Sequence, residues 1–112
     1  MRRVVITGIG LLTNIGFNKN ETWNNLIDCK SGIKKINSFD VSDLPCKIAG
    51  FISNNPEDPD FYNQLIHIDQ KDIKRNDRFI QYGLAAARMA VEDANLNDLS
   101  EIDKLKVGVF LF

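Results

Sequence analysis

The sequence contains few of the residues that build disulfide frameworks or metal sites, because its 112 residues include only two cysteines and one histidine. Cys29 and Cys46 lack the CxxC spacing of zinc and redox motifs, so we expect both thiols to be reduced and structural, as in a cytoplasmic protein. His67 has no partner at the spacing of a metal site or a catalytic triad. The sequence therefore predicts no metal site and assigns no catalytic thiol or imidazole.

Long apolar runs and an excess of charge of one sign are also missing. No stretch approaches the roughly 20 apolar residues that cross a bilayer, and the apolar residues before Gly8 are too few for a secretory signal. The formal net charge of −1 gives no overall field that favours nucleic acid or an anionic membrane. These features predict one small soluble domain, with no nucleic acid, membrane or cofactor as a partner.

Three segments have strong patterns of regular structure. Arg3–Thr7 and Lys106–Phe112 are apolar runs without polar alternation, which predicts strands buried on both faces. The segment Arg78–Asn95 has apolar residues nearly all the way round a helix, with Asp77 as its expected N-cap. We expect this helix to be mostly buried and to pack closely against a neighbouring element through a stripe of small residues. The stripe consists of Gly83, Ala86, Ala87, Ala90 and Ala94.

Weaker patterns predict the remaining elements. We expect a helix over about Glu21–Cys29, with Asn20 as its cap and Gly32 as its left-handed stop. We also expect a short edge strand over 47–52 and one or two helical turns over 69–76. The order of strand, helix, irregular segment, helix and strand predicts an α/β fold with a largely parallel sheet. The segments expected to be irregular or ambiguous are 33–45, 54–60, 61–68 and 95–106.

Three glycines near the N-terminus allow a second interpretation, that of a small Rossmann-like nucleotide binder. Gly8, Gly10 and Gly16 form the pattern GxGxxxxxG, whereas the dinucleotide fingerprint is GxGxxG. No acidic residue ends a second strand about 20 residues further on. We therefore interpret these glycines as turn and close-packing positions, and Trp23 as a packing anchor.

Three stretches, taken together, resemble a known family. The first is Arg2–Gly10 continuing to Gly16, and the third is Asp77–Gly83 followed by Ala85-Ala86-Ala87 and Asp93-Ala94. The second comprises Thr22-Trp23, Leu26, Lys30-Ser31-Gly32-Ile33 and Phe39-Asp40, and Ala49-Gly50 lies between the second and the third. In this order and spacing they resemble the N-terminal part of the β-ketoacyl-[acyl-carrier-protein] synthases, the condensing enzymes of fatty-acid synthesis, type II in particular.

The resemblance implies a thiolase-like α/β fold, a layered αβαβα arrangement of two similar halves. Residues 1–112 would supply only the opening strands and helices of the first half. The family's reaction is the decarboxylative condensation of malonyl-carrier protein with acyl-carrier protein, and its complete enzymes are usually homodimers. Its nucleophilic cysteine and two histidines lie further along than this sequence reaches. We therefore assign no catalytic residue here, and we expect the isolated chain to be inactive and molten, aggregated or oligomeric.

The resemblance also gives a role to a cluster of basic residues. Lys71, Lys74 and Arg75 lie at positions where family members dock the acidic acyl carrier protein. The competing interpretation is a solvated run of charge, partly cancelled by neighbouring aspartates. A further alternative for the whole chain is a non-catalytic, truncated product that at most binds a carrier protein or a partner subunit.

Overall fold

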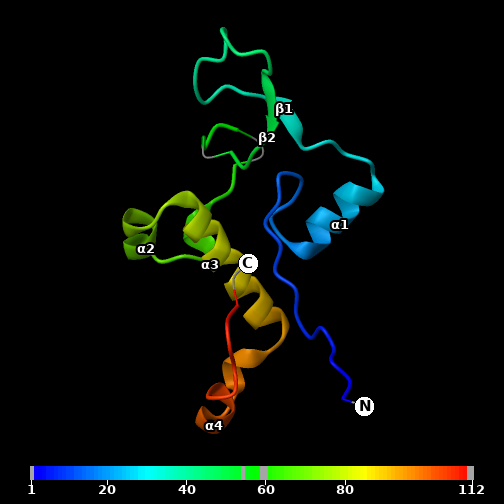
Figure 1. The fold of residues 1–112 in the computed structure, drawn as a ribbon, viewed down its shortest axis with the longest axis vertical. Helices are drawn as coiled ribbons and strands as arrows, with labels where there is room; N and C mark the ends of the chain where they lie inside the picture. Colours follow the sequence, from blue (N-terminus) through cyan, green and yellow to red (C-terminus); the bar gives the residue numbers. More distant parts are fainter. Residues whose placement is uncertain (1, 54, 59–60, 111–112) are drawn as a thin grey trace.

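The computed structural model describes residues 2–53, 55–58 and 61–110, and Figure 1 shows it as an elongated arrangement around one long central helix. The principal extents are 55 × 36 × 25 Å. Two short strands project at one end, and helices α1 and α2 lie on opposite sides of the central helix. The elements are α1 (Lys19–Ile27), β1 (Ile33–Lys35), β2 (Ile48–Gly50), η1 (Gln64–Ile66), α2 (Gln70–Arg75), α3 (Arg78–Asp93), η2 (Leu96–Asp98) and α4 (Glu101–Lys104).

The long helix α3 organises the core. Asp77 is its N-cap residue, as predicted, with extended backbone. The helix buries Gln81, Ala85 and Met89, which are spaced four residues apart and so lie on one face. Tyr62 and Ile68 complete the buried cluster. The prediction of a mostly buried helix is wrong for this structure, because Gln81, Ala85 and Met89 are its buried residues and Phe79 on another face is 74% exposed.

The stripe of small residues on α3 allows a close approach, as predicted. A Cβ atom added at Gly10 would lie 1.9 Å from the carbonyl oxygen of Ala86, and one added at Gly8 would lie 2.4 Å from that of Ala90. Both distances are far below van der Waals contact. The N-terminal segment therefore crosses α3 backbone against backbone, at a place where any side chain would push the two apart.

The carboxylate of Asp93 joins three parts of the chain that are distant in sequence. It accepts a hydrogen bond of 3.0 Å from the Ile9 backbone N–H and pairs with the Lys19 ammonium on α1. The Lys19 side chain and the Ile9 N–H stabilise the ionised carboxylate, and they lower the pKa of Asp93 below its usual value of 3.8. The end of α3, the start of α1 and the N-terminal segment are thus held at one point.

Replacing this carboxylate should remove part of the acid sensitivity of the fold. Because the folded pKa of Asp93 lies below the unfolded value, its stabilisation is complete above the unfolded pKa and is lost as pH falls through the folded pKa. We expect Asp93→Asn to unfold at lower urea concentration near neutral pH and to lose less stability between pH 5 and about pH 2. Urea midpoints across this range measure the effect. Equal pH dependence of both proteins would contradict it.

The sheet differs from the predicted one. β1 and β2 form an antiparallel pair, with Ile33 opposite Gly50 and Lys35 opposite Ile48. β2 lies within the predicted strand 47–52, whereas β1 lies in a segment predicted to be irregular. The Asn14 side chain donates a hydrogen bond of 3.1 Å to the Gly32 carbonyl and fixes the base of the pair. The predicted largely parallel sheet is wrong for the residues described, in which β1 and β2 form the one sheet.

The two apolar runs predicted as buried strands are neither paired nor buried where the structure describes them. The segment 2–10 and residues 107–110 have no regular structure, and Val4 is 93% and Val109 84% exposed. Leu111 and Phe112 lie outside the described residues. The total accessible surface is 9261 Å², whereas a compact monomer of this mass exposes about 6,200 Å². The radius of gyration is 17.1 Å, whereas a compact chain of this length has a radius of about 13 Å. By both measures the structure is more extended than a compact monomer.

The shorter elements require smaller corrections. α1 begins earlier than predicted, because Asn18 rather than Asn20 is its cap and accepts a hydrogen bond from the Glu21 N–H. The left-handed residue after this helix is Cys29, with φ of 55°, whereas Gly32 has negative φ. Trp23 is 63% exposed and is not a packing anchor here. The predicted turns over 69–76 are confirmed as α2, and the predicted polar connection over 95–106 contains η2 and α4.

Candidate functional site

The basic residues singled out in the sequence all lie on α2. Lys71, Lys74 and Arg75 are spaced i, i+3 and i+4, which places them on one face of the helix. All three are exposed, and within the described residues none of them makes an ion pair or a side-chain hydrogen bond. We call these three residues the basic face. Three cations without a partner in the described part of the chain are available to an external anion.

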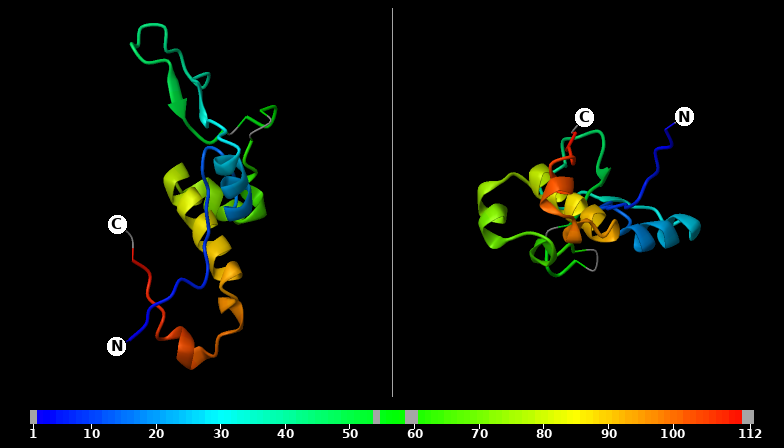
Figure 2. Two further views of the ribbon diagram at one scale, coloured as in Figure 1. Left: turned by 90° about the vertical axis from the view of Figure 1, so that its right-hand side faces the viewer. Right: turned by 90° about the horizontal axis from the view of Figure 1, so that it is seen from below.

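The corner between α2 and α3 holds the basic face in place. The side-chain amide of Gln81 is buried and donates hydrogen bonds to the carbonyls of Ile73, at 3.0 Å, and Asn76, at 2.7 Å. Ile73 packs its other side against the core cluster. A buried amide bonded to both the helix and its end fixes α2 on the outside of the molecule, where Figure 2 shows it. Sequence reasoning missed Gln81, because a glutamine inside an apolar helix pattern has no distinct signal.

A shallow cavity of about 390 Å³ lies directly beside the basic face. Gln70, Ile73 and Lys74 of α2 form one wall, and Lys74 belongs to both features. The other lining residues are Phe61, Asn63 and Leu65. Sequence reasoning did not find this cavity, because the segment 61–68 was ambiguous and carries no motif.

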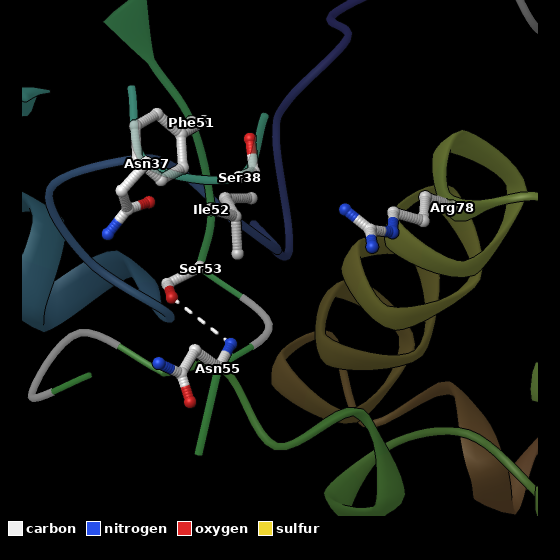
Figure 3. Close-up of a pocket in the computed structure, with 7 residues that line it drawn as sticks. All are labelled: Asn37, Ser38, Phe51, Ile52, Ser53, Asn55 and Arg78. Carbon is white, nitrogen blue, oxygen red and sulfur yellow. Dashed lines mark hydrogen bonds between the residues drawn. The ribbon is translucent and has the colours of Figure 1, made fainter. Parts of the chain in front are cut away.

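A second cavity, of about 220 Å³, lies between the segment after β2 and the first turn of α3. Figure 3 shows the Arg78 side chain extending from α3 toward Ile52 and Ser53. The Ser53 hydroxyl accepts a hydrogen bond of 3.3 Å from the Asn55 N–H. The lining residues described here carry amide, hydroxyl, guanidinium and apolar groups, so they provide hydrogen bonds and positive charge but no nucleophile with an adjacent base.

The structure does not bring the cysteines and the histidine together. Cys29 follows α1 and Cys46 precedes β2, both exposed and free, while His67 lies between η1 and α2. The His67 carbonyl accepts a hydrogen bond of 2.8 Å from Arg88. Among the described residues no group of three or more histidines, cysteines and carboxylates could hold a metal ion. These residues thus form no catalytic or metal-binding arrangement.

The buried Tyr62 and the partly buried Tyr82 do not supply an acid or a base either. The rings of Tyr62 and Tyr82 meet edge to face with centroids 6.4 Å apart. Burial raises the pKa of Tyr62, to which Tyr82 adds, and burial also raises the pKa of Tyr82. Both phenols remain neutral at physiological pH, so we interpret them as packing residues.

The N-terminal glycines serve packing, as the sequence interpretation predicted. Gly8 and Gly10 lie against α3, and Gly16 pairs with Thr13 in a tight turn against Thr22. No strand precedes these glycines within the described residues, so the strand, loop and helix that cradle a dinucleotide are not formed there. In the described part of the chain, no helix has the length and apolar character needed to cross a membrane.

Known proteins are similar in sequence to nearly the whole chain. The chain is 41% identical over 110 residues to the 3-oxoacyl-[acyl-carrier-protein] synthase 2 of Staphylococcus aureus (strain COL), covering 98% of this chain and 25% of that protein. It is 38% identical over 110 residues to a putative mitochondrial 3-oxoacyl-[acyl-carrier-protein] synthase of Schizosaccharomyces pombe, covering 97% of this chain and 26% of that protein. The chain thus spans about a quarter of the length of these curated relatives. The sequence model described as "Beta-ketoacyl synthase, N-terminal domain" matches residues 1–111, and the chain therefore belongs to the β-ketoacyl synthase family.

Proposed function

We propose that this chain is the opening part of a β-ketoacyl-[acyl-carrier-protein] synthase domain that docks the carrier protein. The observation that carries the proposal is the exposed basic face of α2, in a chain that matches the family over residues 1–111. The complete domain would condense malonyl-carrier protein with acyl-carrier protein, with loss of carbon dioxide, in fatty-acid elongation. The residues here supply docking and packing, and the reacting cysteine and histidines come from later parts of such a domain.

The finer fold belongs to the same proposal. In a thiolase-like domain the apolar segments 3–7 and 106–112 would be strands of a central sheet that α3 covers. Two observations support this arrangement. Gly8 and Gly10 already bring the end of the first segment against α3. Val4 and Val109 are exposed although their apolar surface calls for burial. Homodimer formation by the complete enzyme is likewise a proposal.

The basic face would bind the carrier protein by complementary charge. The carrier delivers its acyl or malonyl group and must then leave, which requires a fast and weak encounter. Charges at the edge of an interface raise the association rate and fix orientation with modest gain in affinity. Lys74 and Arg75 also lie in the last turn of α2, where cations stabilise the helix end. The helix can therefore display these charges without a cost to its own stability.

A second candidate function is that of a non-catalytic chain that binds a carrier or partner subunit. The observation that favours it is the position of the basic face, which α2 and its corner with α3 form entirely within this chain. Docking would then not depend on the residues that carry out the reaction. Binding by the 112-residue chain without condensation activity is what this alternative predicts.

Reversing the basic face should weaken carrier binding. We expect the triple variant Lys71→Glu, Lys74→Glu and Arg75→Glu to lose roughly tenfold or more in affinity at low salt, because three favourable contacts become repulsive. Titration of a purified acyl carrier protein at several salt concentrations measures this. The full chain is one host, and a hybrid synthase is the other. In the hybrid, this chain replaces the matching residues of the Staphylococcus aureus relative.

A variant with the same change of charge elsewhere is the control. Lys30, Lys35 and Lys47 are exposed and lie on the β1–β2 side of the molecule. Their reversal to glutamate should alter affinity far less than reversal of the basic face. Equal losses from both triple variants would show a dependence on net charge alone and would contradict docking at α2. Carrier binding that the full chain shows and the hybrid synthase does not would favour the second candidate.

A further inference from the structure

We propose that residues 3–7, here called the N-terminal arm, form an antiparallel pair with the same residues of a second copy of this chain. In this pair Val5 lies opposite Val5 of the second copy, and Arg3 lies opposite Thr7. The two-fold axis of the dimer passes between the two Val5 residues. The inference concerns the 112-residue chain and does not depend on carrier docking.

The N-terminal arm has the composition of a strand and no partner strand. Val4 is 93%, Val5 59% and Ile6 83% exposed, and no strand lies beside the arm in the described residues. Gly8 and Gly10 hold its base against α3, and Figure 1 shows the arm leading away from that contact. A run of β-branched residues favours extended backbone. The unpaired backbone N–H and C=O groups of such a segment are a template for pairing with another chain.

Antiparallel self-pairing of the arm brings apolar side chains together. Successive side chains of a strand point to opposite faces, so Val4 and Ile6 share one face. With Val5 opposite itself, Val4 of each copy lies opposite Ile6 of the other, and the four side chains form one apolar cluster. Directly opposite β-branched pairs stabilise a sheet. Every other register leaves part of the arm unpaired or pairs residues that already pack against α3.

The charges at the two ends of the arm favour the antiparallel direction. The same register places Arg2 opposite Gly8 of the second copy, and Gly8 crosses α3 beside Ala90. That end of α3 contains Glu92 and Asp93, has no basic residue in its last turn and carries the negative end of the helix dipole. Glu92 is exposed and forms no ion pair in the described part of the chain. Each arginine pair thus approaches a negative helix end, whereas parallel pairing would place the arginines side by side.

The chain also has enough free surface for a stable dimer. Its accessible surface exceeds that of a compact monomer of its mass by about 3,000 Å². A standard interface takes about 800 Å² from each partner. Residues 107–110 are the other exposed apolar segment, but Gly108 interrupts them, and glycine weakens a strand. The surface is therefore assigned to the N-terminal arm of a second copy.

Single cysteines in the arm test the register. In the full chain with Cys29→Ser and Cys46→Ser, we expect Val5→Cys to cross-link into a dimer under mild oxidation. Residues directly opposite each other have Cα atoms about 4.5–5.5 Å apart, which is within reach of a disulfide. Val4→Cys and Ile6→Cys are the matched controls. Each alone should cross-link about tenfold more slowly, because its own copy lies two residues along the strand, and the two should cross-link with each other when mixed.

Sedimentation equilibrium of the full chain with its native cysteines reduced tests the dimer without cross-linking. We expect Val5→Lys to weaken dimer formation about tenfold or more, because two ammonium groups would lie directly opposite each other. Leu105→Lys makes the same addition of charge at a residue that is 87% exposed and outside the arm, and it should leave the dimer intact. Glu92→Lys should weaken the dimer about threefold at low salt and less at high salt. Circular dichroism confirms that each variant retains its helix content.

Three results would overturn the inference. The first is a chain that sediments as a monomer at every concentration. The second is equal weakening by Val5→Lys and Leu105→Lys, which would show association through apolar surface in general. The third is rapid cross-linking of a Val109→Cys chain together with slow cross-linking of the Val5→Cys chain, which would assign the pairing to residues 107–110.

Discussion

Replacing Gly10 with alanine should separate the N-terminal segment from α3. The new Cβ would lie 1.9 Å from the Ala86 carbonyl oxygen and 2.7 Å from the Ala90 amide nitrogen. These are backbone atoms inside a helix, so they cannot move aside as the end of a flexible side chain can. We expect a loss of roughly 3 kcal/mol, at the upper end of typical overpacking costs. Urea unfolding followed by the helical circular dichroism signal measures it.

Gly83 offers a matched substitution that should change stability in the opposite direction. It lies inside α3, and a Cβ added there meets nothing within 4 Å. Gly83→Ala should therefore stabilise the helix by about 1 kcal/mol, because alanine loses less backbone freedom than glycine. Both variants are compared at one protein concentration, so that any self-association affects them equally. Equal stability of Gly10→Ala and the unaltered chain would show that the segment does not cross α3 as described.

Helices α1, α2 and α3 could be predicted from the sequence because their signals are local. Asp77 marks the start of α3, and apolar residues at helical spacing follow it without interruption. The stripe of small residues also predicted a close neighbour, which Gly8 and Gly10 provide. The error concerned burial, since the sequence pattern indicates which faces are apolar and cannot show whether another segment covers them. Phe79 illustrates this, because it is apolar in pattern and exposed in the structure.

The strands could not be predicted equally well because a strand depends on partners far away in sequence. The segment 3–7 has the composition of a buried strand, yet no strand lies beside it in the described residues. β1 forms instead in a segment with no strand pattern, because Ile33–Lys35 has Ile48–Gly50 opposite it. Asn14 and Gly32 stabilise the base of that pair, and such a contact across the chain leaves no periodic signal.

The candidate site shows the same division between local and distant information. The sequence predicted one or two helical turns over 69–76, and the structure places Lys71, Lys74 and Arg75 on one face of α2. The cavity beside them depends on how Phe61 and Leu65 fold back along α2, which the sequence does not indicate. The resemblance supplied the hypothesis of docking, and the structure supplied the position of the basic face on α2.

A lysine at position 109 should have opposite effects in the isolated chain and in a complete domain. Val109 is 84% exposed here, so Val109→Lys should leave helix content unchanged and reduce self-association of the isolated chain. In the hybrid synthase, the proposed thiolase-like fold would bury this position in a central strand, where an unpaired charge costs about 4 kcal/mol. We expect soluble hybrid protein and condensation activity to fall sharply. Sedimentation velocity of the chain and activity of the hybrid measure the two effects.

Leu105 provides the control for this prediction. It follows α4, outside the apolar run, and is 87% exposed. Leu105→Lys should be tolerated in both hosts, because the proposed fold requires no burial at that position. If the hybrid tolerates lysine at position 109 as well as at position 105, the segment 106–112 is not a core strand of the complete domain. The exposure of residues 106–110 would then be their ordinary state, and their apolar surface would serve contact with another protein chain.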